Sequence, residues 1–396
     1  MSYAIRYCLI RFCYILSLSF TKTTFYLYLH ETQQLPYTDI AFIFLCFDLS
    51  VIFLELPTAT LGEWFGVRKS FLTGISIKIV ASLLFFLGKC FTIFCLAEFF
   101  SALALCLISG SLEAWLMHQM GKEKNASTSH IFMLGKRASI VALALGGWSG
   151  ALLGGIHLGL PWLFVAIGMA ISYIIAFFFM NDIIQEESFR KRKYSFSHII
   201  QGYKLTIHNR ILFVLLLESF LISFALASPK VVWLPLLKSH FQKNSWFLGN
   251  MWLCIQMIQF IGTFGLSSLL KKYSSLLFWK IFFSILSFGF MMGFVFYQNI
   301  FPFILFYLLL EWIKPYHHAL SLTLVQQETH STGRVTILSF ENLIEKLGNS
   351  IGLFLIGSLT LYYDRSIAWC IGFLLYALII PCYFYCFYKE YKTPTV

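Results

Sequence analysis

Long apolar runs separated by short polar or turn-forming segments make up most of this chain. Most runs approach or exceed the roughly 20 residues that a helix needs to cross about 30 Å of hydrocarbon. Because these runs are far longer than barrel strands, and because a backbone in lipid must satisfy its own hydrogen bonds, the pattern predicts membrane helices. The predicted spans cover residues 5–29, 39–61, 70–88, 91–119, 129–156, 161–180, 211–237, 246–270, 276–297, 301–326, 335–361 and 366–388.

The longest polar stretch, residues 181–210, lies between the sixth and seventh spans. It leaves two near-equal parts, residues 1–180 and 211–396, with six predicted spans each. This division predicts a duplicated transporter architecture, an all-α membrane protein with twelve helices in two pseudo-symmetric bundles and a site between them. The polar stretch itself is interpreted as a solvated cytoplasmic linker attracted to anionic lipid, or alternatively as a regulatory contact.

Composition narrows the class of protein further. Apolar residues make up 59% of the chain and charged residues 12%, whereas soluble domains carry roughly a quarter of charged residues. A soluble enzyme, a secreted disulfide scaffold and a disordered chain are thereby excluded. The ten cysteines are scattered through apolar runs without metal-ligand spacing, so we expect no metal site and no cofactor.

The net charge of +11 does not indicate nucleic acid binding, because the basic residues collect in alternate loops. Such asymmetry is typical of the cytoplasmic side of multi-pass proteins. It predicts an inner-membrane protein with both termini in the cytoplasm and the lipid bilayer as its surroundings. The basic residues on this side are Arg68 and Lys69, Lys122 and Lys124, Arg190 to Lys193, Lys271 and Lys272, and Lys389 and Lys392.

The segment LELPTATLGEWFGVRK, residues 54–69, joins the second and third spans. Gly66 permits a tight turn between two helices, and the carboxylate of Glu63 can pair with Arg68 or Lys69 across it. The segment resembles the loop motif of the major facilitator superfamily, Gly-x-x-x-Asp-Arg-x-Gly followed by basic residues. It departs from that motif at Ala59 and Trp64, which replace the first glycine and the arginine, and Glu63 replaces the aspartate.

Two further stretches, residues 109–114 and 333–339, look like the same family, so the resemblance covers nearly the whole chain. It implies the major facilitator fold and a latch between the two halves formed by Glu63, Gly66, Arg68 and Lys69. The alternative is that Arg68 and Lys69 only set the topology.

Charged residues inside the predicted spans are the candidates for chemistry, because a charge at mid-membrane costs about 2.5–3.5 kcal/mol on insertion scales. In the resembled fold, spans one, four, seven and ten line a central cavity. That placement would give substrate access to Lys22, Glu113, Glu218, Glu311 and Lys314.

Span ten carries Glu311 and Lys314 three residues apart, close enough to neutralise each other in a purely structural pair. His317 follows on the face of Lys314 and is suited to proton relay. His317 and His318 make a poor metal site, since no acidic or cysteine partner stands at ligand spacing.

Spans two and eleven carry the remaining candidates for proton coupling. Glu341, Glu345 and Asn349 recur every four residues and predict a polar stripe, continued by Gly352, that faces water or packs on a neighbouring helix. Glu341 and Glu345 repel each other when both are ionised, which favours holding a proton.

In span two, we interpret Glu55, two residues before Pro57, as structural gating. Asp48 lies nearer mid-membrane and is the preferred single proton site. In span five, Gly146, Gly150 and Gly154 predict close helix packing, with an exporter motif as the weaker interpretation.

These features predict a monomeric secondary transporter of a small molecule, driven by protons because no nucleotide-binding loop is present. The aromatic content of 19% favours efflux of an amphipathic drug, toxin or metallophore. Uptake of a metabolite or siderophore is the alternative. An integral-membrane transferase using His317 and His318 is a more remote one, since the stretch around Ser111 lacks the Gly-X-Ser-X-Gly spacing of a serine nucleophile.

Overall fold

The computed structural model describes residues 2–120, 128–181, 209–240, 245–272, 276–296, 300–328 and 331–392. Regular structure within these ranges is helical, without a strand. Eight helical stretches in the described part of the chain are long and apolar enough to cross a membrane. The structure thus supports the predicted class, a helical multi-pass membrane protein.

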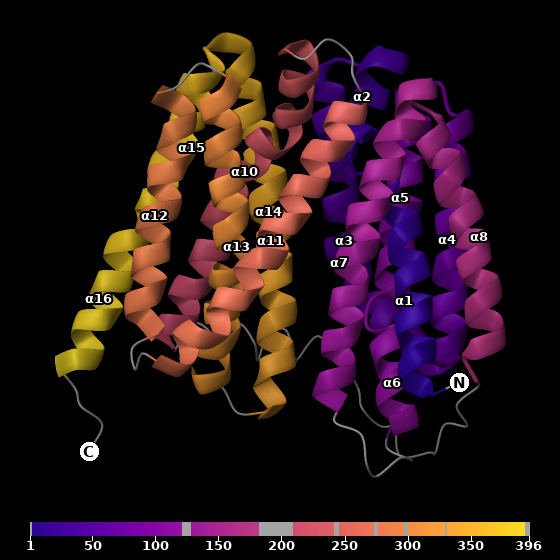
Figure 1. Cartoon of the computed structure of the whole chain (residues 1–396), viewed down its shortest axis with the longest axis horizontal. Helices are drawn as coiled ribbons and strands as arrows, with labels where there is room; N and C mark the ends of the chain where they lie inside the picture. The colour runs from indigo at the N-terminus through magenta and orange to yellow at the C-terminus, as the bar shows by residue number, and fades with distance from the viewer. Residues whose placement is uncertain are drawn as a thin grey trace. The chain divides into compact units, whose positions relative to one another are not determined.

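The chain separates into two compact units, within each of which the helices run side by side (Figure 1). Unit 1 comprises Met1–Tyr194 together with Phe241–Gln256. Its helices are α1 (Tyr3–Ser19), α2 (Phe25–Leu27), the π-helix η1 (Tyr28–Thr32), α3 (Tyr37–Phe65), α4 (Val67–Leu87), α5 (Phe91–Ile108), α6 (Ser111–Met120), α7 (Thr128–Ile156) and α8 (Leu160–Phe179).

Unit 2 comprises Ser195–His240 and Met257–Val396. Its helices are α10 (Arg210–His240), the later part of α11 (Ser245–Lys272), α12 (Leu276–Phe296), α13 (Ile300–Glu328), α14 (Ser331–Tyr362), α15 (Arg365–Ala377) and α16 (Ile379–Lys392).

The first part of α11 groups with unit 1 through two tryptophans. The indole Nε1 of Trp252 donates to the Leu143 carbonyl at 2.8 Å, and that of Trp148 donates to Asn250 Oδ1 at 3.1 Å. Buried indole N–H groups need such partners, so these bonds hold the segment against α7.

Three predicted spans are interrupted. The helix of span one, α1, ends at Ser19. Lys22 was predicted to lie inside this helix, but it is exposed in the turn that follows. Span four divides at Gly110, whose φ of +73° is incompatible with a right-handed helix and is readily adopted only by glycine. Span twelve divides at Leu378, three residues before Pro381, which has no N–H to continue the helical ladder.

Small residues bring helices together as predicted for α7. A Cβ added at Gly150 would lie 1.8 Å from the Phe20 carbonyl oxygen, and one added at Gly146 would lie 2.5 Å from Ser19 Cβ. The glycine stripe of α7 therefore permits close packing against α1 and the turn after it. The same device joins α14 to α10, where a Cβ at Gly348 would lie 2.4 Å from the Phe220 carbonyl oxygen.

Candidate functional site

Unit 2 encloses a cluster of charged and polar side chains centred on Glu218 of α10. Lys280 Nζ of α12 lies 2.6 Å from Glu218 Oε2, and the two side chains are only 1% and 4% exposed. An ion pair this deeply buried needs further hydrogen bonds to offset the loss of water. We call the following residues the Glu218 cluster: Glu218, Lys280, Ser284, Ser287, His317, Ser321 and Tyr383.

Three further side chains, from α12, α13 and α16, also contact the Glu218 carboxylate. Tyr383 of α16 donates its hydroxyl to Oε2 at 2.7 Å, and Ser284 of α12 donates to Oε1 at 3.0 Å. His317 of α13 places Nδ1 3.3 Å from Oε1. These donors replace hydration around the carboxylate, so Glu218 can remain ionised in the interior of the unit.

Lys280 is bonded as fully as its partner. Besides contacting Glu218, its ammonium group donates to Ser321 Oγ at 2.7 Å and to the His317 carbonyl at 3.2 Å. An ammonium group has three protons, and these three acceptors satisfy all of them.

The ring of His317 connects the ion pair to α12. Its Nδ1 also lies 3.3 Å from Lys280 Nζ, and its Nε2 lies 3.0 Å from Ser287 Oγ. A neutral imidazole has one donor and one acceptor nitrogen, so with the proton on Nδ1 the ring donates to Glu218 and accepts from Ser287. Both ring nitrogens therefore lie within reach of an oxygen, Nδ1 facing Glu218 and Nε2 facing Ser287.

A second charged group in unit 2 confirms the ion pair predicted along span ten. Lys314 pairs with Glu311 Oε1, and Gln259 of α11 donates its amide to Glu311 Oε2 at 2.5 Å. Glu311 is buried, whereas the Lys314 side chain is 35% exposed. The ion pair is thus local in sequence. The hydrogen bond from Gln259 of α11 to Glu311 is a contact that the sequence did not indicate.

Unit 1 contains its own charged group, centred on Arg11 of α1. Arg11 pairs with Glu113 of α6 and donates to the Tyr7 hydroxyl at 2.8 Å and to Ser139 Oγ of α7 at 2.7 Å. The side chains of Arg11 and Glu113 are 23% and 37% exposed, which makes this pair more accessible than the Glu218 cluster. Three helices thus converge on one guanidinium.

The acidic candidates of spans two and eleven occupy different surroundings. On α3, Asp48 is buried and Glu55 is half-buried. On α14, Glu341 is half-buried and accepts a hydrogen bond from Ser219 of α10 at 2.8 Å, whereas Glu345 is exposed. The predicted stripe therefore includes one side chain bonded to a neighbouring helix and one on the surface.

Gly66 forms the predicted turn between α3 and α4, with φ of +85°. Arg68 donates to the Phe177 carbonyl of α8 at 2.7 Å and lies over the Phe177 ring at 5.1 Å, while Lys69 is exposed. The side chain of Glu63 lies outside the described residues. The latch formed by this acid stays a prediction.

Lys280 and Lys78 are among the residues that sequence reasoning missed, as are Tyr383 and Arg11. Each of the two lysines is a single lysine inside an apolar run, which was a sufficient signal to include it among the membrane charges. Lys78 of α4 donates to Ser101 of α5 at 2.8 Å and interacts electrostatically with Glu98. Lys280 provides the cation that neutralises Glu218.

Comparison with known proteins identifies the family. The sequence model of the Major Facilitator Superfamily matches residues 7–352, and no curated protein sequence matches. Among solved structures, the nucleoside transporter NupG is similar with a TM-score of 0.79 and 12% identity over 98% of this chain and 99% of that one.

A bacterial homologue of the human lysosomal transporter Spinster is similar with a TM-score of 0.72 and 11% identity, over 99% of this chain and 98% of that one. A POT family transporter in complex with a peptide conjugate also has a TM-score of 0.72, with 13% identity over 98% of this chain and 96% of that one. At such identities these likenesses establish the fold alone. With the family match they show that the chain belongs to the major facilitator superfamily and is a membrane transporter, not the transferase that its sequence left open.

Proposed function

We propose that this transporter moves a small molecule by alternating access and is driven by protons. Its twelve spans form two pseudo-symmetric six-helix bundles, residues 1–180 and 211–396, joined by a cytoplasmic linker. The protein acts as a monomer in the inner membrane, with both termini in the cytoplasm. The alternation of basic loops along the sequence supports this orientation.

The Glu218 cluster is the observation that carries proton coupling. With a neutral His317, the charges of Glu218 and Lys280 cancel. Adding a proton to the ring leaves a net positive charge in a buried site, which is costly unless the surroundings rearrange or water enters. Protonation of the cluster is therefore tied to the packing of α10, α12, α13 and α16, which is the requirement for a coupled carrier.

The acids favoured by sequence alone keep a place in this proposal. Asp48, Glu55, Glu113, Glu341 and Glu345 are further candidates for binding or passing the proton. We place Glu218 and His317 ahead of them because the Glu218 carboxylate contacts both the Lys280 ammonium group and the His317 ring directly. The burial of Glu218 and His317 favours a role inside the bundle over direct contact with the cargo.

We further propose that the cargo leaves the cell and is an amphipathic drug-like compound, toxin or metallophore. The family resemblance places Lys314 along the central cavity and lines that cavity with span one, in which Arg11 lies, and each of these cations is already neutralised by a carboxylate. An anionic nutrient would have to break one of these ion pairs to bind the cation. A neutral or cationic cargo does not face this cost.

Uptake of a metabolite is the alternative. We choose a nucleoside as the test substrate for uptake because NupG, a nucleoside transporter, has a similar fold. Purified protein in liposomes can distinguish the two. Ethidium, labelled organic acids and uridine would be tested for counterflow, and internal pyranine would report proton movement. For efflux, we expect ethidium exchange and accumulation driven by an opposing proton gradient. Exchange of uridine or an acid without ethidium movement would support uptake instead.

The role of the Glu218 cluster is tested with His317→Gln and the neighbouring His318→Gln as its matched control. His317 is buried in the cluster, whereas His318 is exposed on the same helix. We expect His317→Gln to keep counterflow but to reduce accumulation driven by the pH gradient at least tenfold. His318→Gln should keep both. Gradient-driven accumulation that survives in His317→Gln would rule out coupling through this ring.

A further inference from the structure

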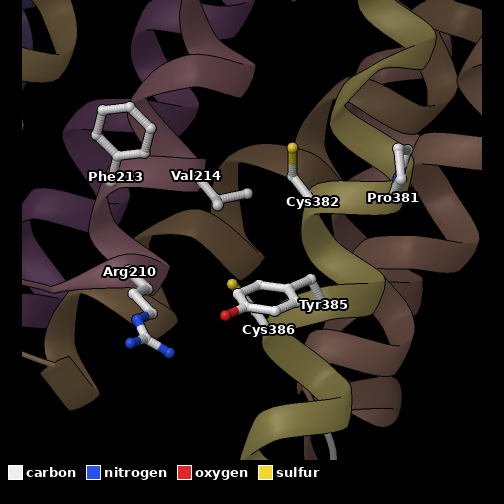
Figure 2. A pocket seen from close by; sticks show the side chains of 7 residues that line it. All are labelled: Arg210, Phe213, Val214, Pro381, Cys382, Tyr385 and Cys386. Atoms are coloured by element: carbon white, nitrogen blue, oxygen red, sulfur yellow. The ribbon is translucent and has the colours of Figure 1, made fainter.

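A groove of about 460 Å³ runs between the first turns of α10 and the helix α16 in unit 2 (Figure 2). Arg210, Phe213 and Val214 line one wall, and Pro381, Tyr385 and Cys386 line the other. This volume lies within the range of roughly 300–1,000 Å³ that is typical of ligand pockets.

The groove is mainly apolar. Val214 and Cys386 at its base are buried, with exposed fractions of 7% and 6%. Phe213 and Tyr385 on its walls are 50% and 56% exposed. In a chain that spans a membrane, exposed aromatic walls of this kind contact lipid.

Cationic groups mark one end of the groove. Arg210 is the first residue of α10 and is exposed, and the Tyr385 hydroxyl end points from α16 toward α10 in Figure 2. Lys389, one turn beyond Tyr385, places Nζ 6.0 Å from the centre of its ring. Arg210 on one wall and Lys389, near the Tyr385 ring, thus bring two cations close to an apolar groove.

The first backbone amides of α10 do not contribute to this end. Asn209 accepts hydrogen bonds from the amides of Ile211 and Leu212 through its side chain, at 3.0 and 3.2 Å. Recognition of an anion here must rely on the side chains of Arg210, Tyr385 and Lys389.

We propose that this groove binds an anionic glycerophospholipid. Its phosphate lies between Arg210 and the Tyr385 hydroxyl, and one acyl chain lies along Phe213 and Val214. Charge complementarity identifies the occupant, since basic side chains with tyrosines at a membrane interface attract anionic headgroups while the groove accepts hydrocarbon. A zwitterionic lipid brings a cationic headgroup that Arg210 and Lys389 repel. This site is independent of the proposed transport function.

Cys382, which also lines the groove and is half-buried, reports occupancy in the full-length protein. In detergent, peptide-resolved labelling with N-ethylmaleimide would be followed with dioleoylphosphatidylglycerol, dioleoylphosphatidylcholine or glycerol 3-phosphate added. We expect phosphatidylglycerol to slow labelling of Cys382 at least threefold, and the other two compounds to leave it unchanged. Cys254, which is exposed on α11, serves as the internal reference.

Arg210→Ala should abolish the protection of Cys382 by phosphatidylglycerol. Lys136→Ala, which removes an exposed cation from α7, is the matched control and should retain the protection. Equal protection by both phospholipids would overturn the proposal, as would protection by glycerol 3-phosphate alone. Unchanged protection in Arg210→Ala would also overturn it.

Discussion

Replacing Lys280 by methionine tests how strongly the buried ion pair stabilises unit 2. Methionine keeps most of the volume of the side chain but leaves Glu218 with only neutral donors, chiefly Tyr383 and Ser284. Because both charged side chains are almost fully buried, solvent screens their interaction little. Removing one partner of a buried pair costs about 3–5 kcal/mol. At about 1.4 kcal/mol per factor of ten, we expect at least a hundredfold larger unfolding constant.

The double variant Glu218→Gln/Lys280→Met separates the charge interaction from the loss of packing. Glutamine keeps an oxygen that accepts from Tyr383 or Ser284, and no unpaired charge remains. Neutral replacements of buried pairs are often tolerated without loss of stability. We expect the double variant to be at least 2 kcal/mol more stable than the sum of the single effects predicts.

Reversible unfolding in mixed micelles, with dodecyl sulfate as the denaturant and circular dichroism as the signal, measures these free energies. Lys136→Met, an exposed change on α7, should stay within about 0.5 kcal/mol of the wild type. If Lys280→Met costs less than about 1 kcal/mol, or if the two single effects add, the ion pair contributes little to the stability of unit 2.

Two further predictions concern unit 1, with a glycine of unit 2 as a control. Gly150→Ala should destabilise the protein by about 1–3 kcal/mol in the same unfolding assay, because the added Cβ would clash with the Phe20 carbonyl. Gly289→Ala, where nothing lies within 4 Å, should be neutral or slightly stabilising, and equal effects of the two changes would contradict this account. Arg11→Lys keeps the positive charge but not the planar fork that reaches Tyr7, Ser139 and Glu113 together, so transport in liposomes should fall about tenfold while the yield of folded protein stays within twofold. Unchanged transport would show that charge alone suffices.

The sequence by itself determined the class of the protein and those contacts that are local along one helix. Long apolar runs can be stable only as membrane helices, since the bilayer offers the backbone no other hydrogen-bond partners. The pair of Glu311 and Lys314 follows from helical spacing, and the turn at Gly66 follows from the conformational freedom of glycine. The glycine stripe of α7 indicated close packing because glycine has no side chain to hold a neighbouring helix away.

Only the tertiary structure decided which charges meet across helices. Glu218, Lys280, His317 and Tyr383 come from α10, α12, α13 and α16, and nothing in their spacing along the chain connects them. Periodicity assigns a side chain to a face of its own helix, but the neighbour of that face depends on how the helices pack. The sequence therefore does not explain a buried lysine such as Lys280. Its partner becomes evident only in the folded chain, where the Glu218 carboxylate lies within hydrogen-bond distance.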